Sequence, residues 1–227
     1  MELPDYWLPQ PQFTVDSSLR SAFDDLLVQA LAQGPASPVA YTLAAPRWQF
    51  LCYAASQAEL ALHGSPDPKI SLFTPRQPLD LRAFGAQNAV YAAADGIWPM
   101  FFAILNRERY PGAIMNACIR VETPDGHTSG PFYFFSISRH LIDQYPWAPG
   151  TIYLLPRKTF SPEPPFPFGE ASIFTHQLAS LEPVVPLAKL QVYPEDFPFL
   201  SGVRFHDDNR LEEYAQVLSQ GLPWPEF

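Results

Sequence analysis

The central motif of the chain is LALHGS, residues 60–65, and the expected fold is built outward from it. Its apolar start predicts a short strand, which ends at the turn signal His63-Gly64-Ser65. A second apolar run, AVYAA (89–93), predicts another short buried strand, and a coil rich in Pro, Asp and Gly (66–88) separates the two. Asp95-Gly96 then leads into IWPMFFAILNRER (97–109), which we expect to form a helix, and its proline is tolerated because it lies near the first turn.

After this helix the pattern changes to β-structure. Pro124-Asp125-Gly126 is a hairpin turn signal between two strand-like stretches. The many aromatic residues of segment 160–200 are expected to lie in ordered coil that packs over the sheet. The four strand-like stretches are AIMNACIRVET (113–123), GPFYFFSIS (130–138), GTIYLLPR (150–157) and VVPLAKLQV (184–192).

Helices are also expected towards both ends of the chain. Residues 17–33 have amphipathic spacing, with Ser17 or Ser18 as the cap, and a second helix begins at Pro46. A last helix is expected to begin at Asp207 or Asp208 and to run to about residue 218. These elements predict one α+β domain over residues 1–227, in which a helical N-terminal segment packs on a mostly antiparallel, split β-sheet. Its parts are an arm with helices (1–58), the α+β core (59–193) and a C-terminal coil with a helix (194–227).

Composition excludes some classes of protein and disfavours others. The 227 residues contain 14 Lys and Arg against 23 Asp and Glu, a net charge of −9. Nucleic acid and anionic membrane surfaces are therefore unfavourable partners. Cys52 and Cys118 form no disulfide framework, and no Cys/His spacing resembles a zinc motif, so no metal is expected. With neither a signal-peptide pattern nor an apolar run of eighteen residues, a cytoplasmic protein is expected.

Three short features occur in order along the chain. They are His63-Gly64-Ser65 at a strand end, Tyr91 on a strand that leads directly into a helix, and Glu182 at the opening of a late strand. Together they resemble the ADP-ribosyltransferase fold of the His-Tyr-Glu class, which includes the poly-ADP-ribose polymerases and the RNA 2′-phosphotransferases. The resemblance covers roughly residues 60 to 192.

The resemblance implies that NAD is the substrate and assigns a role to each residue. The backbone of Gly64 would hold the nicotinamide carboxamide, Ser65 would complete the binding motif, and His63 would donate a hydrogen bond to a ribose hydroxyl. Tyr91 would stack on the nicotinamide. Glu182 would be the catalytic carboxylate that favours the positive charge developing on the ribose.

Two departures from the family pattern bear on activity. Where the polymerases carry a small hydroxyl residue and a second stacking tyrosine, this chain has Pro99 and Phe102. The ring of Phe102 can still stack on nicotinamide. Glu170 and Gln177 are alternatives to Glu182 for the acidic position. If the position belongs to Gln177, the carboxylate is missing.

Two functions therefore stay open. The first is transfer of ADP-ribose to an unidentified protein or small molecule, or hydrolysis of NAD. The alternative is a non-catalytic binding or interaction protein of the same or another α+β fold. In that case His63 is a hydrogen-bonded strand-end histidine and Tyr91 packs in the core. A serine hydrolase is disfavoured because no Gly-x-Ser-x-Gly sequence is present.

Overall fold

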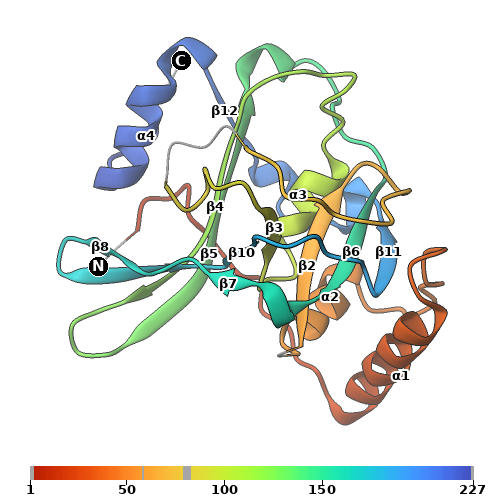
Figure 1. Ribbon diagram of the computed structural model, residues 1–227. Helices are drawn as coiled ribbons and strands as arrows, with labels where there is room; N and C mark the ends of the chain where they lie inside the picture. Colours follow the sequence, from red (N-terminus) through yellow and green to blue (C-terminus); the bar gives the residue numbers. More distant parts are fainter. Residues whose placement is uncertain (1–2, 58, 79–82, 226–227) are drawn as a thin grey trace.

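The computed structural model describes residues 3–57, 59–78 and 83–225, which form two six-stranded sheets and four α-helices (Figure 1). Neighbouring strands pair antiparallel, apart from the parallel pair β12–β5. These observations confirm the prediction of a mixed α+β class with mostly antiparallel sheets. Residues 1–2, 79–82 and 226–227 of the predicted arm, coil and C-terminal segment lie outside the described residues.

The first sheet, which we call the hairpin sheet, is built on a long antiparallel hairpin. The two strands of this hairpin, β4 and β5, are joined by the turn at Gly126, whose φ of 81° suits glycine. The hairpin prediction is therefore confirmed. In Figure 1 this hairpin forms one side of the molecule. The strands are β1 (Leu8–Pro9), β5 (Thr128–Ser138), β4 (Ile114–Glu122), β9 (Ala171–Thr175) and β8 (Phe166–Phe168) in sheet order, with β12 (Arg204–His206) also paired to β5.

The second sheet, which we call the cleft sheet, contains the central motif LALHGS and the second apolar run, AVYAA. LALHGS forms β2, and VYAA forms β3 between β2 and β10. In sheet order the strands are β11 (Ala188–Val192), β6 (Gly150–Pro156), β2 (Leu60–Ser65), β3 (Val90–Ala93), β10 (Gln177–Ser180) and β7 (Ser161–Pro162).

The outer helices follow the expected pattern with small shifts at their ends. Helix α1 (Ser17–Gln33) is capped by Asp16, whose carboxylate accepts a hydrogen bond from the Leu19 amide at 2.8 Å. The predicted caps, Ser17 and Ser18, are instead its first two residues. Helix α2 (Arg47–Ala55) follows Pro46 as expected. Helix α4 (Leu211–Gln220) comes after a 3-10 turn at Asp208–Arg210, and it is this turn that Asp207 caps.

Helix α3 (Trp98–Ile104) packs directly on the cleft sheet. A Cβ atom on Gly64 of β2 would lie 1.8 Å from the Pro99 carbonyl oxygen, and one on Gly150 of β6 would lie 1.9 Å from that of Ala103. Both glycines are therefore required by the close approach of helix and strands. The helix ends before the predicted residue 109, because Leu105 is extended and pairs with Trp147.

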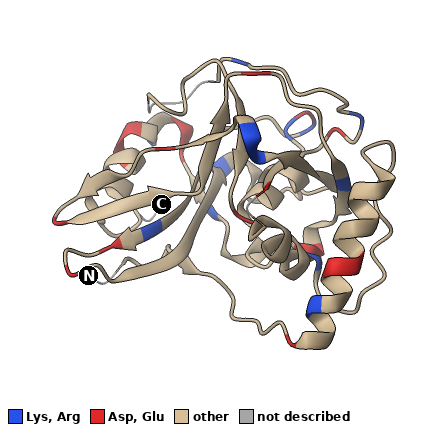
Figure 2. Cartoon of the chain, turned by 60° about the horizontal axis from the view of Figure 1, so that its bottom comes forward, with Lys and Arg blue, Asp and Glu red and all other residues tan. Residues whose placement is uncertain are grey.

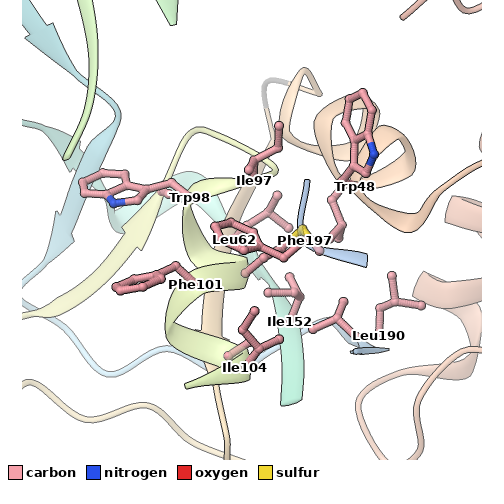
Figure 3. Packing of buried hydrophobic residues seen from close by; sticks show 14 of the residues in the cluster. Trp48, Leu62, Ile97, Trp98, Phe101, Ile104, Ile152, Leu190 and Phe197 are labelled. Atoms are coloured by element: carbon pink, nitrogen blue, oxygen red, sulfur yellow. The ribbon is translucent and has the colours of Figure 1, made fainter. Parts of the chain in front are cut away.

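The main core lies between α3 and the cleft sheet. Figure 3 shows Ile104 of α3 close to Leu62, Ile152 and Leu190 of the sheet, and all four are at most 1% exposed. Phe197, from the aromatic C-terminal part of the chain, joins the same cluster. The aromatic residues of 160–200 therefore contribute to the core, as expected.

Segment 158–183 differs from the prediction. It was expected to be coil, yet it contains the short strands β7 to β10, of two to five residues each. Their partners lie elsewhere in the chain: β10 pairs with β3, and β9 pairs with β4. Such short strands give no readable alternation in the sequence. The strand expected at 184–192 is limited to β11, residues 188–192.

Charged positions among the described residues are scattered over helices, strands and loops in the view of Figure 2. Within the same residues, no helix is both long and apolar enough to span a membrane. The prediction that nucleic acid is an unfavourable partner still rests on the net charge of −9.

Candidate functional site

The candidate site is a cleft where β2 and β3 separate. The register pairs Leu62 with Ala93 and gives no second pair between these two fully described strands. We call the opening beyond that pair the β2–β3 cleft. Its volume is about 140 Å³. Binding pockets for whole small molecules are usually about 300–1,000 Å³, so this cleft has room for one end group of a larger ligand. It is lined by Leu62, His63, Gly64, Tyr91, Ala92, Ala93, Trp98, Pro99, Phe102 and Gln177.

His63 lies between the separating strands. Its Nδ1 is 2.7 Å from the carbonyl oxygen of Tyr91, and its ring centroid is 4.6 Å from that of Phe73. Burial lowers the pKa of His63, and the nearby charge of Arg76 lowers it further, while the bond to the Tyr91 carbonyl raises it. The ring is therefore neutral at pH 7. Because a carbonyl only accepts, Nδ1 carries the proton and Nε2 is an acceptor. The expected contact of His63 with a ribose hydroxyl stays a prediction, in which this tautomer would accept the hydrogen bond at Nε2.

Tyr91 and Phe102 supply aromatic surface to the cleft from two elements, β3 and α3. The Tyr91 hydroxyl lies 2.8 Å from the carbonyl oxygen of Phe84 and 3.0 Å from that of Gln87. These contacts tie the loop before β3 to the tyrosine. The hydroxyl is therefore engaged by the protein itself.

The other two residues of the central motif differ in their surroundings. Gly64 lines the cleft, and its missing side chain lets Pro99 approach. Ser65 is buried, and its Oγ accepts a hydrogen bond from the Asp67 amide at 3.1 Å. Ser65 does not line the cleft, and its side chain stabilises the turn after β2.

Of the three residues considered for the acidic position, Gln177 is the one that lines the cleft. This residue opens β10, pairs with Ala93 and lines the cleft. Glu182 is exposed, follows β10 and lies in the connection to β11, so it does not open a strand as expected. Glu170 is exposed in the turn between β8 and β9. Neither glutamate lines the cleft, and the cleft-lining residues given above include no carboxylate.

A second and larger pocket lies where the two sheets meet, and we call it the seam pocket. Its volume of about 630 Å³ is in the usual range for small-molecule sites. Asp95, Arg120, Arg157 and His176 are among the residues that line it. Two of these residues, Asp95 and His176, form a cluster with the buried Cys118, in which the three ligand atoms lie within 4.8 Å of one another.

Sequence reasoning did not find the seam pocket. Its Asp95 was interpreted as a turn residue and Cys118 as core, and neither forms a recognisable spacing with His176. The three residues come from the β3–α3 connection, the middle of β4 and the residue before β10. No local sequence signal joins them, because strand pairing between distant segments brings them together. The expectation of no metal stays untested.

Comparison of the chain with known protein families, with curated proteins and with solved structures gave no match. The resemblance to ADP-ribosyltransferases therefore stays a prediction. Function has to be argued from the chemistry of the β2–β3 cleft and the seam pocket.

Proposed function

We propose that this chain is an ADP-ribosyltransferase-like protein that binds the nicotinamide end of NAD in the β2–β3 cleft without cleaving it. One observation carries the proposal. His63, Gly64, Tyr91 and Phe102, all named from the sequence as NAD-binding residues, line one cleft together with Gln177. The cleft thus has the binding groups that the resemblance implies, but an amide where catalysis needs a carboxylate.

Binding would use backbone and ring surfaces. Gly64 has no pairing partner on β3, so a ligand carboxamide can approach that edge of β2. Phe102 offers aromatic surface to the flat nicotinamide, and Tyr91 lines the same cleft from β3. Nε2 of His63 can accept a hydrogen bond from a ligand hydroxyl. Because the cleft holds only about 140 Å³, the rest of the dinucleotide would extend outside it.

Gln177 explains why binding would not lead to turnover. Breaking the bond between nicotinamide and ribose develops positive charge on the ribose, and a carboxylate stabilises that charge. A glutamine amide can hydrogen-bond to a ribose hydroxyl but carries no negative charge. A carboxylate on the adjoining segment, that of buried Glu163, accepts a hydrogen bond from Thr175 at 2.7 Å and lies outside the cleft lining.

The test combines calorimetric titration with NAD and chromatographic measurement of free nicotinamide, on the natural chain and on Gln177→Glu. We expect saturable binding to both and nicotinamide release that is at least about tenfold faster in Gln177→Glu, which restores the charge. ADP-ribosyl transfer or NAD hydrolysis, the activity implied by the resemblance, is then what the variant regains.

The matched control is Glu182→Gln, which changes an exposed glutamate outside the cleft and should alter neither binding nor release. Absence of NAD binding in the natural chain would disprove the proposal. Rapid nicotinamide release that Glu182→Gln abolishes would restore the original catalytic assignment of Glu182 and would overturn the assignment of Gln177.

A further inference from the structure

We propose that Asp95, Cys118 and His176 bind one zinc ion at the seam pocket. Their ligand atoms, a carboxylate oxygen, a thiol sulfur and an imidazole nitrogen, lie within 4.8 Å of one another. Asp95 is 5% exposed and Cys118 is fully buried, whereas His176 is half-buried at the pocket wall. This site uses different residues from the β2–β3 cleft and does not depend on NAD binding.

The two sheets hold these residues in place. The backbone amide of His176 donates to the Cys118 carbonyl at 3.2 Å, which joins β4 of the hairpin sheet to the start of β10 in the cleft sheet. The Ala94 amide donates to the His176 carbonyl at 2.9 Å and so extends the β3–β10 pairing up to Asp95. Strand pairing therefore holds the backbones of these residues near one another: Cys118 lies within β4, His176 directly precedes β10, and Asp95 follows β3 by two residues.

Each polar ligand is also oriented by a further hydrogen bond. Nδ1 of His176 is 2.8 Å from the Ala94 carbonyl oxygen, so in the neutral ring it carries the proton and Nε2 presents a lone pair. The Tyr133 hydroxyl donates to one oxygen of Asp95 at 2.7 Å. The amides of Ile97 and Trp98 donate to the other oxygen at 2.8 and 2.7 Å. Outer hydrogen bonds of this kind are typical around metal ligands, where they fix tautomer and orientation.

The Asp95 contacts also fit a simpler role, in which the carboxylate only caps α3. That role accounts for the oxygen bonded to Ile97 and Trp98. It does not use the imidazole of His176 or the thiol of Cys118, whose ligand atoms lie within 4.8 Å of the carboxylate. A bound cation would use all three groups.

The donor set and its geometry favour zinc. Thiolate and imidazole ligands select zinc over magnesium, calcium or manganese. Zinc bonds of about 2.0–2.3 Å place neighbouring ligand atoms roughly 3.3–3.8 Å apart, so the cluster needs to contract by at most about 1.0–1.5 Å. Three protein ligands leave the fourth tetrahedral position open towards the seam pocket, where water would bind. Arg120 and Arg157 line the same pocket, so an anion could replace that water.

The experiment is metal titration of chelator-treated protein. We expect one Zn²⁺ per chain with a Kd below about 1 µM. His176→Gln and Cys118→Ser should each weaken binding by more than about 100-fold, because loss of an outer hydrogen bond alone already costs 10–100-fold. Titration with Co²⁺ should give a sulfur-to-metal charge-transfer band that Cys118→Ser removes.

Cys52→Ser is the matched control. Cys52 also lines the seam pocket but lies outside the three-residue cluster, so its variant should keep both the affinity and the cobalt band. Because Cys118 is buried and its variant could unfold, His176→Gln at the half-exposed position provides the second test, with circular dichroism of the metal-free protein as the check of folding. The proposal is overturned if the natural chain shows no saturable Zn²⁺ binding. It is overturned equally if a folded His176→Gln protein binds Zn²⁺ as tightly as the natural chain.

Discussion

Among single residues, Tyr91 allows ligand binding and protein packing to be tested separately. Its hydroxyl group contacts the Phe84 and Gln87 carbonyls, and the residue is one of those that line the β2–β3 cleft. The two halves of this side chain can therefore be removed one at a time. In the same way, the neutral His63 ring uses one nitrogen for the Tyr91 carbonyl and keeps the other free.

The prediction is that Tyr91→Ala weakens NAD binding by at least about tenfold, because stacking surface worth more than about 1 kcal/mol is lost. Tyr91→Phe keeps the ring and should change the Kd by less than about threefold, while lowering the melting temperature through the lost hydroxyl contacts. Calorimetry and thermal unfolding measure the two effects. Tyr145→Ala, at a tyrosine 64% exposed, is the control. Equal loss of binding in both Tyr91 variants would contradict the stacking role.

At the scale of elements, α3 is placed by two glycines. Gly64 of β2 and Gly150 of β6 have no side chain, and the helix backbone approaches the two strands closely at these residues. This contact sets the wall of the β2–β3 cleft, because Trp98, Pro99 and Phe102 all belong to α3. The helix position and the shape of the cleft therefore depend on the same close approach.

We predict that Gly150→Ala destabilises the chain by about 1–3 kcal/mol or more, because the new methyl group would lie 1.9 Å from a backbone carbonyl that cannot easily move. In a domain of this size, each kcal/mol corresponds to about 2–4 °C in melting temperature. Thermal unfolding is the measurement. Gly126→Asn is the control, because Asn tolerates positive φ and the turn has open space around it. An unchanged melting temperature for Gly150→Ala would mean that α3 does not lie this close to β6.

In the folded molecule as a whole, tertiary packing buries polar groups, among them two histidines. His206 of β12 is fully buried, and its Nδ1 contacts the Ser136 hydroxyl of β5 at 2.8 Å. Burial lowers the pKa of His206, although Asp208 and Asp207 oppose this shift. Burial likewise lowers the pKa of His63. The folded chain thus holds two histidines that resist protonation.

This arrangement predicts a loss of stability in mild acid. An unfolded histidine takes up a proton near pH 6.5. The folded histidines do so only at lower pH, so below about pH 6.5 the unfolded state binds more protons and the free energy of unfolding falls. Denaturant unfolding between pH 7.5 and 5.5 measures the slope. His206→Gln should reduce the slope, and His127→Gln, at an exposed histidine, should leave it unchanged. A flat profile in the natural chain would contradict the lowered pKa values.

Local sequence patterns are sufficient to predict the elements whose signals are continuous along the chain. Helix α1, the β4–β5 hairpin and strand β2 were predictable because apolar spacing and turn residues act over short distances. The same reasoning named His63, Gly64, Tyr91 and Phe102, and all four line the cleft. It also identified Gln177 as an alternative to Glu182, but could not choose between them.

Which distant residues contact one another depends on the three-dimensional pairing of the strands. The two-to-five-residue strands β7 to β10 are held by pairing with partners elsewhere in the chain, and their own sequence is too short to show a period. The register of β10 against β3 places Gln177 in the cleft and leaves Glu182 outside it. The same strand pairing brings Asp95, Cys118 and His176 together. Because pairing energy depends on contacts between segments far apart in sequence, no local pattern could have located this cluster.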